Sequence, residues 1–531
     1  MSGAATGTRP PWSLGRQLAH QAGSGASGSG RLWPRLIGAG VSGLLATAAF
    51  PPYDLWPLAV PAVTLLVLVC RGQRPRRAAL LGLVHGLGLF LPLLEWMRVI
   101  GPDAWVLLSL LEAAFVATMA GLLPLLDRRP LWPVWVACLW VAQELARATV
   151  PFGGFPWGRL AFGQTAAPYA PYAALGGAPL VTFATALSGA LLAYAVVTRD
   201  RRRPAALGAV AIAVAVPVAG LAVPLPTDGT PTTAAVVQGS VPGSGLDFAG
   251  EREEVLRRHV AATRRLADDV QAGRVAAPDL VIWPENASDI DPFGDAGARA
   301  LIDAAVDAVG VPVLVGAVLD GPGPDHVSNT GIVWDPESGP GARYVKRHPV
   351  PFGEYIPFRE QLGGLVSRLD QIPRDFYAAD RPGVLQVGPA RVGDVICFEI
   401  AYDGLVRDVV DRGAQVVVVQ TNNATYNGTG QPAQQLAMSR LRAVELGRSV
   451  LVASTSGLSA VVAPDGALLA GTDEYEARTL VRAVPLRDGR TVAARLGGLP
   501  EWVLAGLGLG AAAVGAAAAR RSRRELAGAG R

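Results

Sequence analysis

Long apolar blocks with almost no charge limit what this chain of 531 residues can fold into. A helix that crosses a bilayer needs about 17–25 mostly apolar residues. Such segments must be helical, because hydrocarbon leaves backbone N–H and C=O groups no other partner. The blocks that reach or approach this length cover residues 36–53, 55–70, 78–97, 104–126, 131–147, 170–198, 205–224 and 502–519. The sequence therefore predicts a multi-pass α-helical membrane domain with eight spans.

Basic residues indicate how the predicted spans are oriented. Arginines gather in alternate connections and at the C-terminus, in residues 9–35, 71–77, 128–129, 199–203 and 520–524. Short loops rich in Lys and Arg stay on the cytoplasmic side of a membrane. Eight spans with both termini in the cytoplasm place residues 225–500 on the outer face. The net charge of +4 is small, and no basic patch interleaved with aromatic residues points to nucleic acid.

A second interpretation makes the first block a cleaved signal peptide, because "ATA" at residues 46–48 resembles a cleavage site. The basic lead before this block is longer than a usual signal-peptide n-region. Cleavage would leave the rest of the predicted topology unchanged, so we keep the first block as a span.

The composition divides the chain into five regions. A Gly/Ser-rich stretch, "AGSGASGSG", marks a flexible cytoplasmic lead. The predicted regions are the lead (1–34), a membrane domain of about seven transmembrane helices (35–224), an outer domain (230–490), a C-terminal transmembrane helix (500–519) and a basic cytoplasmic tail (520–531).

In the outer domain, short runs of Val and Ile alternate with amphipathic segments. Strands are predicted at 233–241, 279–285, 311–318, 330–336, 391–398, 414–422, 449–455 and 459–466, and helices at 251–270, 296–309, 402–412 and 432–447. Strands that are apolar on both faces lie in sheets covered by helices. The pattern predicts an α/β layered domain.

Cys397 is the only cysteine of the outer domain, since Cys70 and Cys138 lie in apolar blocks. A free cysteine is often a small buried hydrophobic residue. A reactive cysteine needs a cation or a base beside it. Glu285 ends the strand "LVIWPE", and Lys346 lies in the proline-rich run "ARYVKRHPVPFGEYIPFR". We expect these strand ends to converge on one site.

Three motifs carry a family resemblance. "WPE", "YVKRHPVPFGEYIP" and "CFE" resemble the Glu, Lys and Cys signatures of the nitrilase superfamily. Together with the preceding spans, the loop "GGFPWGRLAFGQ" at 153–164 and the last span, the chain resembles the membrane-anchored apolipoprotein N-acyltransferase family. The resemblance implies a nitrilase-like αββα sandwich, with Cys397 as nucleophile, Glu285 as general base and Lys346 stabilising the oxyanion.

The resemblance also implies supporting residues. Glu354 matches a second glutamate that orients Lys346 or the incoming amine, and Glu399 and Phe398 are expected to support the site. Phe398 replaces a frequent tyrosine, while Asn423 and Thr425 of "TNNATYNG" replace an acid and a tryptophan. We expect these departures to affect lipid preference. His348 is not expected to act, because the family gives it no role.

The implied reaction transfers a fatty acyl chain from a membrane phospholipid, through a cysteine thioester, to the N-terminal amine of a diacylated apolipoprotein. It implies the bacterial plasma membrane, with the catalytic domain on the extracytoplasmic face. One alternative is a membrane-tethered amidase or nitrilase that transfers to water. Another is a non-catalytic scaffold for an envelope glycosyltransferase, since some relatives associate with a polyprenol-mannose synthase.

Polar features of the predicted spans leave two interpretations open. Glu95, Glu112 and Glu144 either line a lipid access path or form structural pairs, such as Glu144 with Arg147. The loop at 153–164 is apolar enough to dip into the membrane interface. No His cluster, Cys-x-x-Cys pair or phosphate-binding glycine loop is present in the sequence, so we expect no cofactor or metal.

Overall fold

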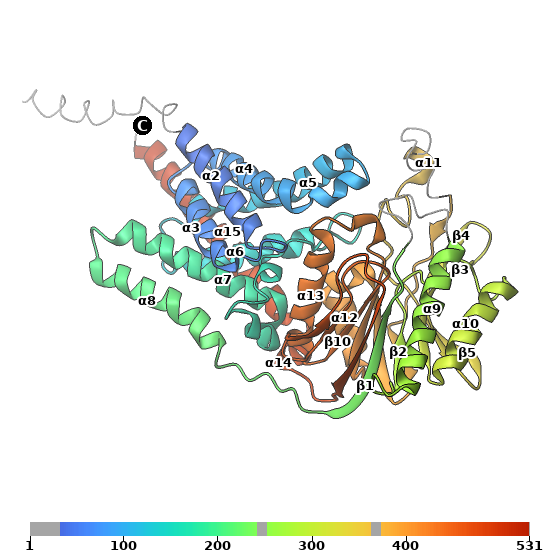
Figure 1. Ribbon diagram of the computed structural model, residues 1–531. Coiled ribbons are helices and arrows are strands. Elements are labelled where there is room, and N and C mark those ends of the chain that lie inside the picture. The colour runs from blue at the N-terminus through green and yellow to red at the C-terminus, as the bar shows by residue number, and fades with distance from the viewer. Residues whose placement is uncertain (1–31, 242–251, 363–372, 530–531) are drawn as a thin grey trace, which may run out of the picture.

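A computed structural model describes residues 32–241, 252–362 and 373–529 (Figure 1). Most of the predicted lead (1–34) and residues 530–531 of the predicted tail lie outside the described residues. Within them, the chain forms a helical part followed by an α/β part, and its last helix returns to the helical part.

The helical part contains every predicted apolar block. Its helices are α2 (Leu32–Ala48), α3 (Ala59–Cys70), α4 (Pro75–Leu93), α5 (Pro102–Leu122), α6 (Trp132–Arg147), α7 (Ala173–Thr198), α8 (Arg203–Gly220) and α15 (Leu499–Ala529). In the described residues, 5 helical segments are long and apolar enough to cross a membrane. They are Pro75–Leu93, Pro102–Leu125, Ala170–Thr198, Arg203–Gly220 and Leu499–Leu526. The count of eight spans stays a prediction, because α2, α3 and α6 are shorter.

The last helix joins the bundle by packing on α6. A Cβ on Gly508 of α15 would stand only 2.7 Å from the backbone of Cys138 and Leu139 on α6. Only glycine permits so close an approach of two helices at this point. The C-terminal helix is therefore an integral part of the helical bundle rather than an appended anchor.

The α/β part contains two mixed sheets. The first has the order β13-β1-β2-β3-β4-β5, with β6 pairing β4, and the second has the order β12-β11-β10-β9-β8-β7. The first sheet's strands are β1 (Thr230–Gln238), β2 (Leu280–Ile282), β3 (Val313–Asp320), β4 (His326–Asp335), β5 (Gly339–Val345), β6 (Asp375–Phe376) and β13 (Arg478–Leu486). The second sheet's are β7 (Gly383–Val387), β8 (Ala390–Ile396), β9 (Val416–Thr421), β10 (Val450–Ser454), β11 (Ala460–Val462) and β12 (Leu468–Gly471).

Helices cover the outer face of each sheet, which gives four layers (Figure 1). α9 (Arg252–Gln271) and α10 (Ala296–Val309) pack on the first sheet, and α12 (Asp403–Asp411) and α13 (Gln431–Leu446) pack on the second. The short helices are α11 (Arg359–Leu362) and α14 (Val492–Leu496). On β9, Val416 and Val418 point between the sheets, while Val417 and Val419 point to the helices. The predicted αββα sandwich is confirmed.

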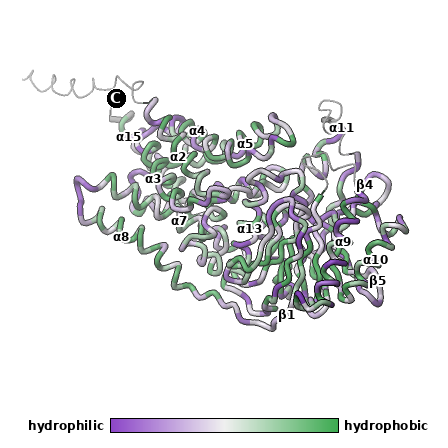
Figure 2. Tube along the Cα trace, in the orientation of Figure 1, coloured by the Kyte–Doolittle hydropathy of each residue, from purple (hydrophilic) through white to green (hydrophobic). Residues whose placement is uncertain are grey.

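The α12–α13 layer lies between the second sheet and the membrane helices. One continuous apolar cluster contains Val417 of the sheet, Leu441 of α13 and Val181 of α7. Figure 2 shows hydrophobic residues along both the membrane helices and the strands, with a hydrophilic turn between α7 and α8. The α/β part therefore rests on the helical part through buried apolar surface.

Buried charges tie the two parts together. Arg159, in the loop after α6, contacts Asp403 of α12 at 2.6 Å and Glu501 of α15 at 3.1 Å. Arg442 of α13 forms ion pairs with the same Asp403 and with Glu445. All of these side chains are largely buried, and a buried ion that loses its partner is strongly destabilising.

Replacing Asp403 with Asn should therefore lower stability by about 3–5 kcal/mol, because two buried arginines lose a shared carboxylate. Burial opposes the charge of Asp403, but Arg159 and Arg442 outweigh it and hold its pKa below the usual range. This contribution is full above the unfolded pKa of about 4 and is lost as pH falls through the folded pKa.

The measurement is thermal unfolding of the purified protein in detergent at pH 7, where the contribution of Asp403 is full, and at pH 3, where part of it is lost. Asp269→Asn, which removes an exposed partner of Arg274, serves as control and should cost less than about 1 kcal/mol. Equal melting temperatures for the two variants would contradict the assignment of the buried cluster as a stabilising link.

Candidate active site

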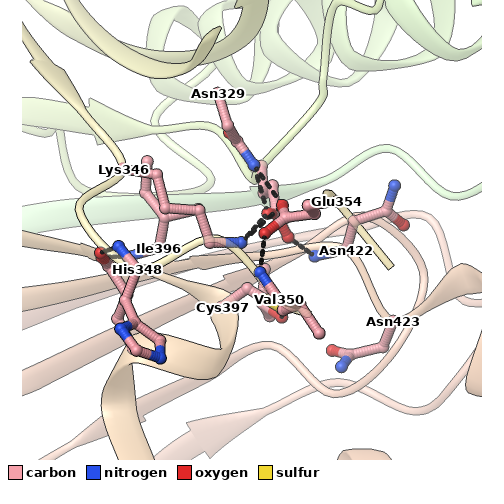
Figure 3. Close-up of polar contacts among 12 residues, drawn as sticks. Asn329, Lys346, His348, Val350, Glu354, Ile396, Cys397, Asn422 and Asn423 are labelled. Carbon is pink, nitrogen blue, oxygen red and sulfur yellow. Dashed lines mark hydrogen bonds and ion pairs between the residues drawn. The ribbon is translucent and has the colours of Figure 1, made fainter. Parts of the chain in front are cut away.

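The site is centred on the buried ammonium of Lys346, the residue that follows β5. Its Nζ lies 3.1 Å from Oε1 of Glu285 and 2.8 Å from Oε1 of Glu354 (Figure 3). Lys346 is only 1 % exposed, so its charge is stabilised by these carboxylates rather than by water. The structure thus brings Glu285 to Lys346, which lies 61 residues later in the sequence, and to Glu354, which follows Lys346 by 8.

Fixed donors hold both carboxylates in place. The side-chain amide of Asn329 on β4 donates to Glu285 at 2.6 Å and to Glu354 at 3.3 Å. The second oxygen of Glu285 accepts from the backbone N–H of Asn422, and the second oxygen of Glu354 accepts from the backbone N–H of Val350, both at 2.7 Å. The carboxylates therefore keep one orientation before any substrate binds.

Cys397 lies directly after β8, at the start of a 3₁₀ turn, with φ of 56°. This left-handed conformation is rare for a residue with a side chain and persists only where the surroundings enforce it. Figure 3 shows Cys397 near Lys346 and Glu354. The Sγ atom accepts a hydrogen bond from Thr421 Oγ1 at 3.3 Å, and Gln435 Nε2 lies 3.9 Å from it.

Burial favours the thiol of Cys397 over the thiolate. Burial raises the pKa of Cys397 to about 12, Glu285 adds to the increase, and Lys346 opposes it. Burial also disfavours the ammonium of Lys346, but Glu285 and Glu354 outweigh this and raise its pKa well above the usual value. At neutral pH the site therefore holds a thiol and an ammonium within the same buried cluster.

Glu399 anchors the backbone around the site and does not contact the ammonium. Its carboxylate accepts from the hydroxyl of Tyr344 at 2.9 Å and from the backbone N–H groups of Arg347, His348 and Ile396 at 2.8–3.0 Å. Burial raises the pKa of Glu399, while these donors lower it. The carboxylate joins the turn at Cys397 to the chain that follows Lys346.

Phe398 faces the helical part. Its ring stacks on Phe155 and Trp157 and meets Tyr402 edge-on. The loop at 153–164 is therefore covered by the α/β part, and its residues 156–164 are buried. Trp157 and Phe398 stack on each other in this buried contact, and the position of the loop relative to the membrane interface stays a prediction.

Other predicted polar residues have structural partners. The ring of His348 packs 4.1 Å from Tyr402, and burial lowers its pKa. Glu95 pairs with Arg98 at the surface. Arg147 pairs with Glu112 at 3.2 Å, which corrects the expected pairing with Glu144.

Glu144 is satisfied by other groups. It accepts from the backbone N–H of Leu160 and from the hydroxyl of Thr182, each at 2.8 Å. A carboxylate with two fixed donors inside the bundle orders the loop that follows α6. Its role here is structural.

Sequence reasoning missed the polar residues that support the cluster, namely Asn329, Thr421 and Gln435. For Asn329 and Thr421 the available signal was a polar residue inside or at the end of an apolar strand, as in "HVSNTGIVW" and "VVVVQTNN", while Gln435 lies on α13. Asn423, expected to affect lipid preference, is buried and donates to Gln431 and Gln435. It therefore belongs to the polar network behind Cys397.

Two family models match this chain. Residues 42–191 match the apolipoprotein N-acyltransferase N-terminal domain, and residues 233–494 match carbon-nitrogen hydrolase. The first match lies in the helical part and the second in the α/β part, and α8 lies between the two matches.

Curated relatives match most of the chain. An apolipoprotein N-acyltransferase of Mycolicibacterium smegmatis is 39% identical over 87% of this chain and 82% of its own length. That of Azotobacter vinelandii is 31% identical over 90% of this chain and 93% of its own length. A solved amidase structure from Nesterenkonia sp. aligns with 50% of this chain and 94% of that chain at 20% identity, with a TM-score of 0.34.

The high pKa of Cys397 predicts slow alkylation at neutral pH. Labelling by iodoacetamide should keep accelerating from pH 7 to above pH 10, because only the thiolate reacts and its population rises until pH passes the pKa of about 12. The measurement is the labelled fraction of the Cys397 peptide by mass spectrometry. A rate that levels off below pH 8 would show that the resting site already holds the thiolate.

Proposed function

Because the chain belongs to the apolipoprotein N-acyltransferase family, we propose that it moves a fatty acyl chain from a membrane phospholipid to the N-terminal amine of a diacylglyceryl-cysteine apolipoprotein, with Glu285, Lys346 and Cys397 as its catalytic triad. It is an acyltransferase of the membrane. The observation that carries the triad is the buried contact of Lys346 with Glu285 and Glu354 beside a free cysteine.

The first step forms a thioester. Glu285 takes the proton of Cys397 as Sγ attacks the ester carbonyl, and the oxygen of the carbonyl becomes negatively charged. When the intermediate collapses, the ester C–O bond breaks, and Glu285 returns its proton to the departing glycerol oxygen. The products are a lysophospholipid and an acyl group on Cys397. A general base is required because burial keeps the thiol protonated.

The second step forms the amide. The amine of the acceptor attacks the thioester carbonyl and loses a proton to Glu285, which passes it to the leaving sulfur of Cys397. Atoms balance, since the phospholipid loses one acyl group and the apolipoprotein gains it. The thiol is restored for another cycle.

Lys346 stabilises the oxyanion of both steps, together with the backbone N–H of Phe398. A fixed donor at a developing oxyanion typically lowers a barrier by roughly 3–4 kcal/mol. Glu354 holds Lys346 in position together with Glu285, because it contacts the same Nζ and is itself fixed by the backbone of Val350. Glu399 and Phe398 are positioning residues that fix the turn carrying Cys397.

The same proposal includes the division and orientation of the chain. A membrane domain over 35–224 and a final span over 500–519 hold the catalytic domain, residues 230–490, on the extracytoplasmic face. The arginine-rich connections support this orientation. Acyl chains then need not leave the membrane, which would cost about 0.8 kcal/mol per methylene. Association with a polyprenol-mannose synthase stays a prediction.

The test incubates the purified protein with phospholipid and a synthetic diacylated lipopeptide. Intact-mass analysis should show one fatty acyl group on Cys397 before lipopeptide is added and triacylated lipopeptide afterwards. Cys397→Ser should form no thioester, and Glu285→Gln should slow its formation by about 100-fold or more.

Two results would overturn the proposal. Free fatty acid without triacylated peptide would mean a hydrolase that transfers to water. Normal lipoprotein N-acylation in cells that carry only Cys397→Ser, but not in cells that lack the protein, would mean a non-catalytic scaffold. Arg257→Ala, on the exposed face of α9, serves as a variant with full activity.

A further inference from the structure

Asp394 is a fully buried carboxyl group that the proposed mechanism does not use. It lies on β8, where its neighbours Val392 and Ile396 point into the space between the two sheets. Because side chains alternate along a strand, Asp394 points there too. Within the described residues, neither of its oxygens has a hydrogen-bond partner, and none of the ion pairs includes it.

Gln420 lies beside it on the same face of β9. Its Nε2 donates to the backbone oxygen of Trp283 at 2.7 Å, while its Oε1 has no partner in the described structure. A Cβ on Gly331 of β4 would stand 2.1 Å from Asp394 Oδ2 and 2.7 Å from Gln420 Oε1. The two unpaired oxygens therefore meet in the space that the missing side chain of Gly331 leaves free.

A carboxylate without donors does not remain ionised in such a place. Burying an unpaired charge is costly enough that the group takes up a proton instead. Burial raises the pKa of Asp394 well above its usual value, and the negative charges of Glu399 and Glu285 add to the effect. The protonated group has one O–H donor, and Gln420 Oε1 is a neighbouring acceptor that lacks one.

We propose that Asp394 is a positioning residue for acyl transfer, whose protonated carboxyl donates to Gln420 and thereby joins the strands that carry the nucleophile and the base. The proposal rests on the function assigned to Cys397 and Glu285 above. The resulting chain runs from the Asp394 hydroxyl to Gln420 Oε1, and from Gln420 Nε2 to the oxygen of Trp283.

Each end of this hydrogen-bond chain lies within three residues of a catalytic group. Cys397 follows Asp394 by three residues, and Glu285 follows Trp283 by two. Between them, Gln420 immediately precedes Thr421, which donates to the sulfur, and Asn422, whose N–H holds Glu285. This hydrogen-bond chain crosses from the second sheet to the first, so it fixes the distance between the nucleophile Cys397 and the base Glu285.

The experiment compares Asp394→Val with Asp394→Asn in the full-length protein. Valine removes the donor at similar size, and the rate of acyl-enzyme formation should fall by about 10- to 100-fold, because a small misplacement of reacting groups has effects of that order. Asparagine keeps a donor to Gln420 Oε1, so its rate should lie closer to that of the unsubstituted protein. KM for phospholipid should change little in both.

Two controls separate positioning from stability. Val392→Ala opens a cavity on the same face of the same strand and should lower the melting temperature while acyl-enzyme formation stays near normal. Gln420→Leu should reduce the rate of acyl-enzyme formation as Asp394→Val does. The variant with both substitutions should be no slower than either single variant, because both substitutions break the same hydrogen-bond chain. Infrared spectra in an ester-free detergent should show a carboxylic-acid C=O band that Asp394→Asn removes.

The outcomes distinguish this inference from the proposed function. If Cys397→Ser still forms acyl-enzyme, the proposed function fails. If Cys397→Ser is inactive but Asp394→Val acylates at the normal rate, the role of Asp394 fails and the proposed function stands. Additive losses in the double variant, or an unchanged infrared band in Asp394→Asn, would also overturn the role of Asp394.

Discussion

The buried ammonium of Lys346 is the interaction on which the site depends. An isolated ammonium inside a protein would lose its proton, and here two carboxylates keep it charged. One of them, Glu285, is the group proposed to accept a proton. The other, Glu354, keeps the ammonium paired while Glu285 changes its charge. In this proposal Glu354 stabilises the ammonium, and Glu285 transfers the proton.

This arrangement explains why so many neutral donors surround the cluster. Two carboxylates and one ammonium leave an excess of negative charge, which the amide of Asn329 and the backbone N–H groups of Asn422 and Val350 stabilise. These donors come from different segments: Asn329 lies on β4, Asn422 directly follows β9, and Val350 lies in the segment after Lys346.

Much of this could be predicted from the sequence, because the signals are local. Apolar length located the helices, runs of Val and Ile located the main strands, and short motifs singled out Glu285, Lys346 and Cys397. Contacts between residues that are distant in the sequence were harder to predict. Arg147 pairs with Glu112, 35 residues away, rather than with nearby Glu144. The supporting residues Asn329 and Gln435 depend on strand order and helix packing, which a single sequence does not reveal.

The position of α13 determines whether the α/β part can be produced without the membrane helices. Almost all of this helix is buried, with the second sheet on one side and the membrane helices on the other. Cutting the chain at the end of the bundle would expose that helix and remove from Asp403 one of its two buried arginine partners, Arg159. The α/β part produced alone for screening or crystallisation would therefore expose apolar surface and aggregate. Inhibitor discovery needs the full-length protein in a lipid mimic.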